Sequence, residues 1–183
     1  MTTRATRTFT ASTALVLTLL AGLAQASGTP DQLAIDYMAA LRKDGLTAAP
    51  AFIDPAELLR FKEMLMPLVR REAASGDMPI TEALFGKGTK LAQVEAMPPL
   101  DFCNALMRVL GEKIGDVKYG EVQVLGTVRE KDVVHVVARV GTEVSPGVQM
   151  NTVTVISTRK SADGWKLMLT GELEGLAAGL RSQ

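Results

Sequence analysis

The residue periodicity of this chain changes once, near Tyr119, and this change constrains the fold more than any other feature. Before it, apolar residues recur every three or four positions, which is typical of amphipathic helices. After it, Val, Thr and Ile dominate, and apolar and polar residues alternate, which predicts strands. Helices followed by strands, rather than alternating with them, favour an α+β fold with the helices packed on one face of an antiparallel sheet.

The first half predicts two helices with clear starts, followed by three more helical segments. Thr29-Pro30-Asp31 provides a capping residue with proline at the first helical position, and Asp44-Gly45 ends that helix. The second helix starts at Asp54, and Glu57 is placed to complete a capping box. Pro67 lies inside it and predicts a kink or a restart. The further helical segments are 80–85, 91–97 and 100–110, and the basic residues of the second helix, which we assign to its solvated face, are Arg60, Lys62, Arg70 and Arg71.

The second half predicts four strands, and the links between them are short enough to require antiparallel pairing. Asp163-Gly164 supplies the positive φ that the last hairpin turn needs. In the second strand every other residue is apolar, which places His135 and Arg139 on the opposite face. The expected strands are 121–129, 133–140, 147–159 and 165–173; the apolar set of the second is Val134, Val136, Ala138 and Val140, and the covered set of the last is Trp165, Leu167, Leu169 and Leu173.

The first 26 residues have the pattern of a signal peptide. Arg4 and Arg7 precede an apolar run from Ala14 to Ala24, and Ala24-Gln25-Ala26 fits the small-x-small cleavage rule. The run is shorter than the roughly 20 residues of a membrane helix, and an uncleaved anchor is the alternative. We therefore expect a signal peptide at 1–26 and one domain at 27–183, periplasmic or secreted, with no membrane span after cleavage.

Composition excludes several classes of function. The chain carries 20 basic and 20 acidic residues and only 4% aromatics, so it lacks the basic surface of a nucleic-acid-binding protein. With one His and one Cys it cannot form the usual Cys/His zinc sites, and no motif indicates a metal or a cofactor. Cys103 falls in a helical pattern, where we expect a small buried hydrophobe; a reactive thiol or an intermolecular bridge is the alternative. GKGTK, residues 86–90, lacks the phosphate-loop spacing and predicts a loop.

Three segments resemble the NTF2-like superfamily: the helix DQLAIDYMAALRKDG, the hairpin VQVLGTVREKDVVHVVARV, and the ending VTVISTRKSADGWKLML. The resemblance implies a cone in which a curved antiparallel sheet wraps around N-terminal helices. It also implies a concavity between sheet and helices. Members of this superfamily include ketosteroid isomerases and dehydratases as well as proteins that bind small ligands or other proteins, so the resemblance does not choose among functions.

The sequence supports three functional hypotheses. The favoured one is non-catalytic binding of a small apolar ligand or an envelope protein in a pocket between helices and sheet, because no base, nucleophile or metal cluster is evident. The second is a ketosteroid-isomerase-like isomerase or a dehydratase that uses Tyr37 or His135 in that pocket, since a phenol can stabilise an oxyanion and an imidazole can move a proton. The third is a structural homodimer through the face that bears His135 and Arg139, where Val133 and Val137 add an apolar strip. We expect the pocket to be lined by Tyr37, Met38, Phe61 and Trp165.

One further pair of residues carries two interpretations. Glu172 and Glu174 would share one face of the expected last strand. Two adjacent carboxylates can bind a cation or act as acid and base, and a solvent-facing strand edge accounts for them equally well.

Overall fold

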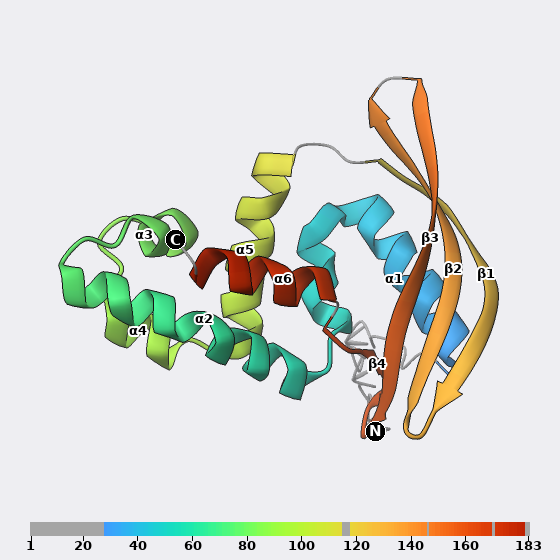
Figure 1. Cartoon of the computed structure of the whole chain (residues 1–183), viewed down its shortest axis with the longest axis horizontal. Coiled ribbons are helices and arrows are strands. Elements are labelled where there is room, and N and C mark those ends of the chain that lie inside the picture. The colour runs from blue at the N-terminus through green and yellow to red at the C-terminus, as the bar shows by residue number, and fades with distance from the viewer. Residues whose placement is uncertain (1–27, 115–117, 146, 170, 182–183) are drawn as a thin grey trace, which may run out of the picture.

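The computed structural model of the chain describes residues 28–114, 118–145, 147–169 and 171–181, and the expected signal peptide lies outside this range. The predicted α+β class is confirmed, because helices pack against a four-stranded antiparallel sheet (Figure 1). The elements are α1 (Pro30–Asp44), the 3-10 helix η1 (Gly45–Phe52), α2 (Pro55–Ser75), α3 (Pro79–Phe85), α4 (Leu91–Ala96), α5 (Pro99–Ile114), β1 (Lys118–Glu130), β2 (Val133–Ser145), β3 (Val148–Ser161), β4 (Gly164–Leu167) and α6 (Gly171–Arg181).

The sheet has the order β1-β2-β3-β4, with each strand antiparallel to the next. Its inner face is set by β2, on which the predicted apolar set is confirmed. Gly164 at the last turn has a φ of 108°, a conformation that favours glycine because it has no Cβ. The inner-face residues of β2 are Val134, Val136, Ala138 and Val140, each at most 6% exposed.

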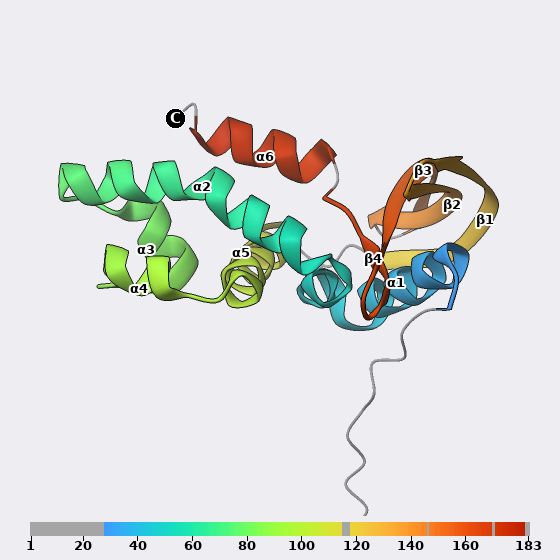
Figure 2. The ribbon, with the colours of Figure 1, turned by 90° about the horizontal axis from the view of Figure 1, so that it is seen from below.

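The helix α1 lies inside the curve of the sheet, as Figure 2 shows. The Thr29 hydroxyl accepts a hydrogen bond from the Gln32 N–H at the start of α1, and the Gly45 N–H donates to the Leu41 carbonyl at its end. Both predicted ends of this helix are therefore confirmed. Its buried side, which includes Leu33 and Met38, faces the sheet and η1.

The helices α2, α3, α4 and α5 form a lobe beside the sheet, which we call the helical lobe, and α6 lies along α2 (Figures 1 and 2). Its centre is almost fully buried, with Phe61, Val94 and Phe102 each 0% exposed. Cys103 is also 0% exposed, so its predicted identity as a small buried hydrophobe is confirmed. Among the helices, α1 makes the main contact with the sheet, and η1 packs between α1 and α5.

The helix α2 runs through Pro67 without a break, which contradicts the predicted restart. Proline costs a helix one hydrogen bond and crowds the preceding turn. Here the ring is exposed, while the stripe of Phe61, Leu65 and Leu68 on the opposite side is buried at 4% exposure or less. Burial of that stripe along both halves of the helix offsets the lost bond.

Three charged residues of α2 are buried, and each binds a different element. Lys62, which the sequence assigned to the solvated face, is 8% exposed and donates to the carbonyls of Glu95 and Met97 at 2.7 and 2.6 Å. It therefore caps the C-terminus of α4, where free carbonyls attract a cation. Glu72 accepts three hydrogen bonds at the start of α3, from the N–H groups of Ile80 and Thr81 and from the Thr81 hydroxyl.

The third buried charge is Glu57, and the predicted capping box does not form. Asp54 accepts a bond from the Ala56 N–H as expected of a cap, but its own N–H donates to the Leu167 carbonyl at 2.9 Å and is not free for Glu57. Glu57 instead lies 3.0 Å from Arg60 and 3.8 Å from Arg159. Its carboxylate thereby connects α2 to β3.

The predicted strand 165–173 is wrong beyond Leu167, because β4 ends there and α6 starts at Gly171. Leu173 and Ala177 lie four residues apart, and Ala177 is 0% exposed, so α6 buries one side against the helices. The strand face expected to carry Glu172 and Glu174 therefore does not form, because both positions belong to α6. Glu174 pairs with Arg60 and raises the pKa of that guanidinium by a hydrogen bond.

In the part of the chain that the structure describes, no helix combines the length and the apolar composition that a bilayer crossing needs.

Candidate functional site

An apolar cleft of about 440 Å³ lies between α1, η1 and the inner face of the sheet, and we call this space the cleft. Part of its lining is the buried cluster of Met38, Leu41, Ala49 and Val140, each at most 6% exposed. The cleft draws on segments far apart in the chain: Tyr37, Met38 and Leu41 of α1; Leu46 and Ala49 of η1, with Ile53 after it; Met107 of α5; Leu167 of β4 with Met168; and Leu173 of α6.

The polar groups of the cleft are neutral hydroxyls, most of them on the sheet side. Thr142, Thr152 and Thr154 project from the inner face of β2 and β3, and the phenols of Tyr37 and Tyr119 complete the set. Burial raises the pKa of Tyr119, so its phenol stays protonated at neutral pH. None of the described lining residues is an Asp, Glu, His, Lys or Arg.

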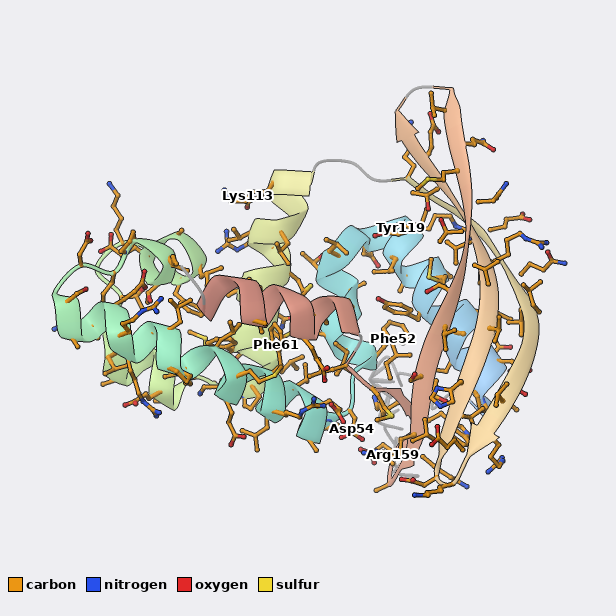
Figure 3. All side chains as sticks on the ribbon, in the orientation of Figure 1. Phe52, Asp54, Phe61, Lys113, Tyr119 and Arg159 are labelled. Atoms are coloured by element: carbon orange, nitrogen blue, oxygen red, sulfur yellow. The ribbon has the colours of Figure 1, made fainter. Side chains whose placement is uncertain are left out.

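The sequence-predicted ligand residues divide into two groups. Tyr37 and Met38 line the cleft, and the Tyr37 ring packs edge-on against Phe52 with the ring centroids 5.6 Å apart. Phe61 is 0% exposed inside the helical lobe, away from the sheet (Figure 3). Trp165 lies on β4 opposite Lys160, half-buried against the main core, and is not among the described lining residues. Of the four predicted residues, the structure therefore brings only Tyr37 and Met38 together at the cleft.

His135, the other catalytic candidate, lies on the outer face of the sheet. Its Nδ1 is 2.9 Å from the Ser157 hydroxyl and its Nε2 is 3.4 Å from the Glu130 carboxylate. Its sequence neighbours Val134 and Val136 point to the opposite, buried face. His135 and the helix α1 that carries Tyr37 thus lie on opposite sides of the sheet.

The part of the cleft that η1 supplies was not predicted from the sequence. The segment Gly45–Phe52 has no helical or strand period, and Pro50 lies inside it, so periodicity gave no reason to place it. The available signal was its composition. An apolar run between two capped helices has to be buried against a neighbouring element.

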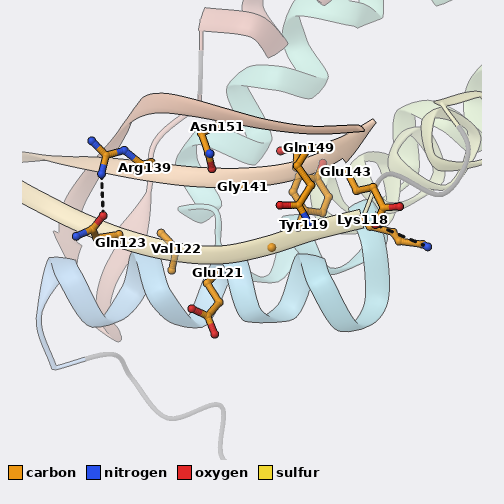
Figure 4. Close-up of a pocket in the computed structure, with 12 residues that line it drawn as sticks. Lys118, Tyr119, Glu121, Val122, Gln123, Arg139, Gly141, Glu143, Gln149 and Asn151 are labelled. Carbon is orange, nitrogen blue, oxygen red and sulfur yellow. Dashed lines mark hydrogen bonds and ion pairs between the residues drawn. The ribbon is translucent and has the colours of Figure 1, made fainter. Parts of the chain in front are cut away.

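A second and larger hollow, of about 640 Å³, lies on the outer face of the sheet (Figure 4). Glycines at 120 and 141 leave its floor without side chains. Several of its charged groups have neighbouring partners: Arg139 donates to Gln123 at 2.9 Å, and Lys118 lies 4.0 Å from Glu143. These paired charges do not converge on one point, so we favour the cleft, where the lining has one chemical character.

The described residues contain no group of three or more His, Cys, Asp or Glu side chains placed to hold a metal ion. Compared with known proteins, the chain matches no family model, no curated protein and no solved structure. The proposed function therefore rests on the lining and the volume of the cleft.

Proposed function

We propose that the protein binds a small apolar ligand in the cleft without transforming it. The observation that carries this proposal is the lining, which is aliphatic at its centre and has only neutral hydroxyls at its rim among the described residues. Its volume falls within the range of about 300–1,000 Å³ in which proteins bind small molecules, and such sites are mostly apolar with a few polar groups for orientation.

The lining also defines the class of ligand. A charged head group would lose its hydration without gaining an opposite charge, which costs several kcal/mol. A neutral hydroxyl or carbonyl, by contrast, can bond to the threonines and to the protonated Tyr119 phenol. The expected ligand therefore has an apolar body and at most one or two neutral polar groups.

An isomerase or dehydratase is less well supported by this site. Proton abstraction next to a carbonyl requires a base near pH 7 and a group that stabilises the oxyanion. The phenols of Tyr37 and Tyr119 can donate a hydrogen bond, but the described lining residues offer no carboxylate or imidazole to act as the base.

A homodimer through the outer face is the second candidate function, and a specific observation favours it. Val153 and Val155 of β3 are 57% and 54% exposed, next to the partly buried Val137 of β2. This adds to the apolar strip that the sequence predicted around His135 and Arg139. A monomer at micromolar concentration in native mass spectrometry or light scattering would remove this candidate.

Two proposals about the whole chain accompany the function. We propose that residues 1–26 direct export to the periplasm or the medium and are removed after Ala26, which the small-x-small motif supports. We also propose that the domain is NTF2-like, which the curved sheet around α1 supports.

The test is native mass spectrometry of the chain, expressed with its N-terminal segment intact and purified without detergent. We expect an adduct of a few hundred daltons that dissociates on activation, and a protein mass that lacks residues 1–26. Thr154→Trp places an indole in the cleft from its rim and should abolish the adduct. Thr127→Trp is the matched control, because Thr127 also faces inward on the sheet, opposite Val136, but is exposed and outside the cleft. Equal adducts in both variants would refute the proposal. It would also be refuted if the unmodified protein showed no adduct even after incubation with the apolar dye Nile red at a saturating concentration.

A further inference from the structure

The two edges of the sheet differ in how they are protected. Edge strands usually carry charges or bulges that prevent another strand from pairing with them. β1 has both, with register shifts at Tyr119/Val122 and Val124/Gly126 and four charged residues. On the other side β4 pairs only with Thr158–Ser161, so β3 has no described strand beside it from Val148 to Ile156. That stretch, VQMNTVTVI, contains no charge and no proline.

The direction of the main-chain groups on this edge is fixed by one hydrogen bond. The Met168 N–H donates to the Ser157 carbonyl at 2.9 Å, so the main-chain groups of Ser157 point away from β2. Along an antiparallel strand this direction alternates, and no register shift interrupts β3 between Gln149 and Arg159. The N–H and C=O groups of Val153 and Val155 therefore point to the same open side.

This open edge borders the cleft. Thr152, Thr154 and Ile156 of β3 face inward and line it. Val155 and Ser157 are also among the lining residues although their side chains face outward, which places the strand edge itself at the mouth of the cleft. A strand added here would direct alternate side chains into the cleft, and its other side chains would lie beside the exposed Val153 and Val155.

We propose that β3 binds an extended segment of a partner protein by strand addition, with large apolar side chains at alternate positions of that segment. The main-chain hydrogen bonds to Val153 and Val155 give affinity, and the cleft selects the inward-facing side chains. This inference rests on the proposed function, since it assigns an occupant to the same cleft.

A partner segment fits this edge better than a second copy of the chain does. In a symmetric pairing of two β3 strands about Val153, the second copy would place its Thr154 and Thr152 opposite Thr152 and Thr154, and its Met150 opposite Ile156. Two of these three inward-facing residues are threonines. Threonine is too short and too polar to fill an aliphatic space of about 440 Å³. A segment with Leu, Ile or Phe at alternate positions fills it.

The experiment selects nine-residue peptides from a phage-displayed random library against the full chain and then measures their affinity as synthetic peptides. We expect apolar residues at positions i, i+2 and i+4. N-methylation of the residues whose N–H groups face β3 should weaken binding at least tenfold, and methylation of the intervening residues should not. Val153→Pro removes one edge N–H and leaves the bonds to β2, and it should weaken binding roughly tenfold, while Val153→Thr should not.

Nile red binding, measured on the same variants, separates the two proposals. If Nile red binds Val153→Pro as it binds the unmodified chain, the cleft is intact and any loss of peptide binding reports the edge. Peptides insensitive to the N-methylation pattern, or no enriched peptide while Nile red still binds, would overturn strand addition and leave the ligand proposal standing. A dimer that Val153→Pro converts to a monomer would assign the edge to a second copy instead. If neither Nile red nor any peptide binds, both proposals fail.

Discussion

Ile53 forms a parallel bridge with Leu167, and the next N–H along the chain, that of Asp54, donates to the Leu167 carbonyl. Both bridged residues are 5% exposed and line the cleft. The bridge fixes the start of α2 to the end of β4, at the junction between the helical lobe and the sheet. This side of the cleft is therefore held by main-chain bonds as well as by side-chain packing.

Because α5 of the helical lobe lines the cleft through Met107, the stability of the lobe matters to the site. The first prediction concerns Glu72, whose buried carboxylate accepts three hydrogen bonds from Ile80 and Thr81. Glu72→Gln leaves one acceptor oxygen and turns an amide NH₂ toward the donors, so at least one buried N–H loses its partner. We expect the free energy of unfolding in urea to fall by about 1–3 kcal/mol. Glu63→Gln, an exposed change on the same helix, is the control and should shift it by less than about 0.5 kcal/mol. Equal shifts would contradict this role.

The second prediction concerns Lys62. Lys62→Met keeps much of the aliphatic side chain but removes the ammonium that caps α4 through Glu95 and Met97. The two carbonyls then lose a charged donor, and we expect a loss of about 1–3 kcal/mol in the same assay. Lys87→Met, in the exposed loop before α4, should leave the urea midpoint unchanged. If both substitutions are neutral, water satisfies the carbonyls and the cap is dispensable.

The sequence predicted the elements whose signals are local. The cap at Thr29, the inner face of β2 and the Gly164 turn each depend on a few neighbouring residues, and the structure confirms them. The errors arose where tertiary contacts decide. Lys62 has the sequence context of a surface residue and is buried only because α4 ends above it. The alternation of apolar and polar residues in Trp165–Leu169 predicted a continuous strand, whereas strand pairing stops at Leu167.

The candidate site was predictable only in part, for the same physical reason. Tyr37 and Met38 lie on the apolar side of a helix that the sequence showed clearly. Ile53, Met107 and Leu167 meet at the cleft from segments more than fifty residues apart, and no local pattern encodes that meeting. The open edge of β3 likewise depends on β4 being four residues long, which only the pairing register shows.

The third prediction concerns the close approach of Gly120 to Gly141. A Cβ at position 120 would lie 3.2 Å from the Gly141 carbonyl oxygen, a main-chain atom that can move only with β2. Gly120→Ala should therefore cost about 1–3 kcal/mol and deform the outer hollow. Gly126→Ala, on the same strand with nothing within 4 Å, is the matched control and should be neutral or slightly stabilising. If Gly120→Ala is as stable as the control, β1 and β2 separate at this point without cost.

The last prediction concerns Cys103, the only thiol of the chain, whose burial raises its pKa to about 11. Because the thiolate is the reactive form, Ellman's reagent at pH 8 should react with the folded protein on the order of 100-fold more slowly than with the urea-unfolded protein. Cys103→Val should give no signal, and fast reaction in the folded state would show that the thiol is accessible.

The raised pKa also has a consequence for stability with a definite sign. Between pH 9 and pH 11 the unfolded chain loses the thiol proton and the folded chain keeps it. The unfolded state therefore binds fewer protons, and the free energy of unfolding falls as pH rises through this window, by about 2 kcal/mol at its upper end. Urea titrations from pH 7 to 11 should show this fall in the free energy of unfolding of the unmodified protein. The fall should be shallower in Cys103→Val, because only Tyr119, whose pKa is also raised by burial, and ordinary alkaline titration contribute there. Parallel curves for the two proteins would mean that the thiol ionises equally in both states.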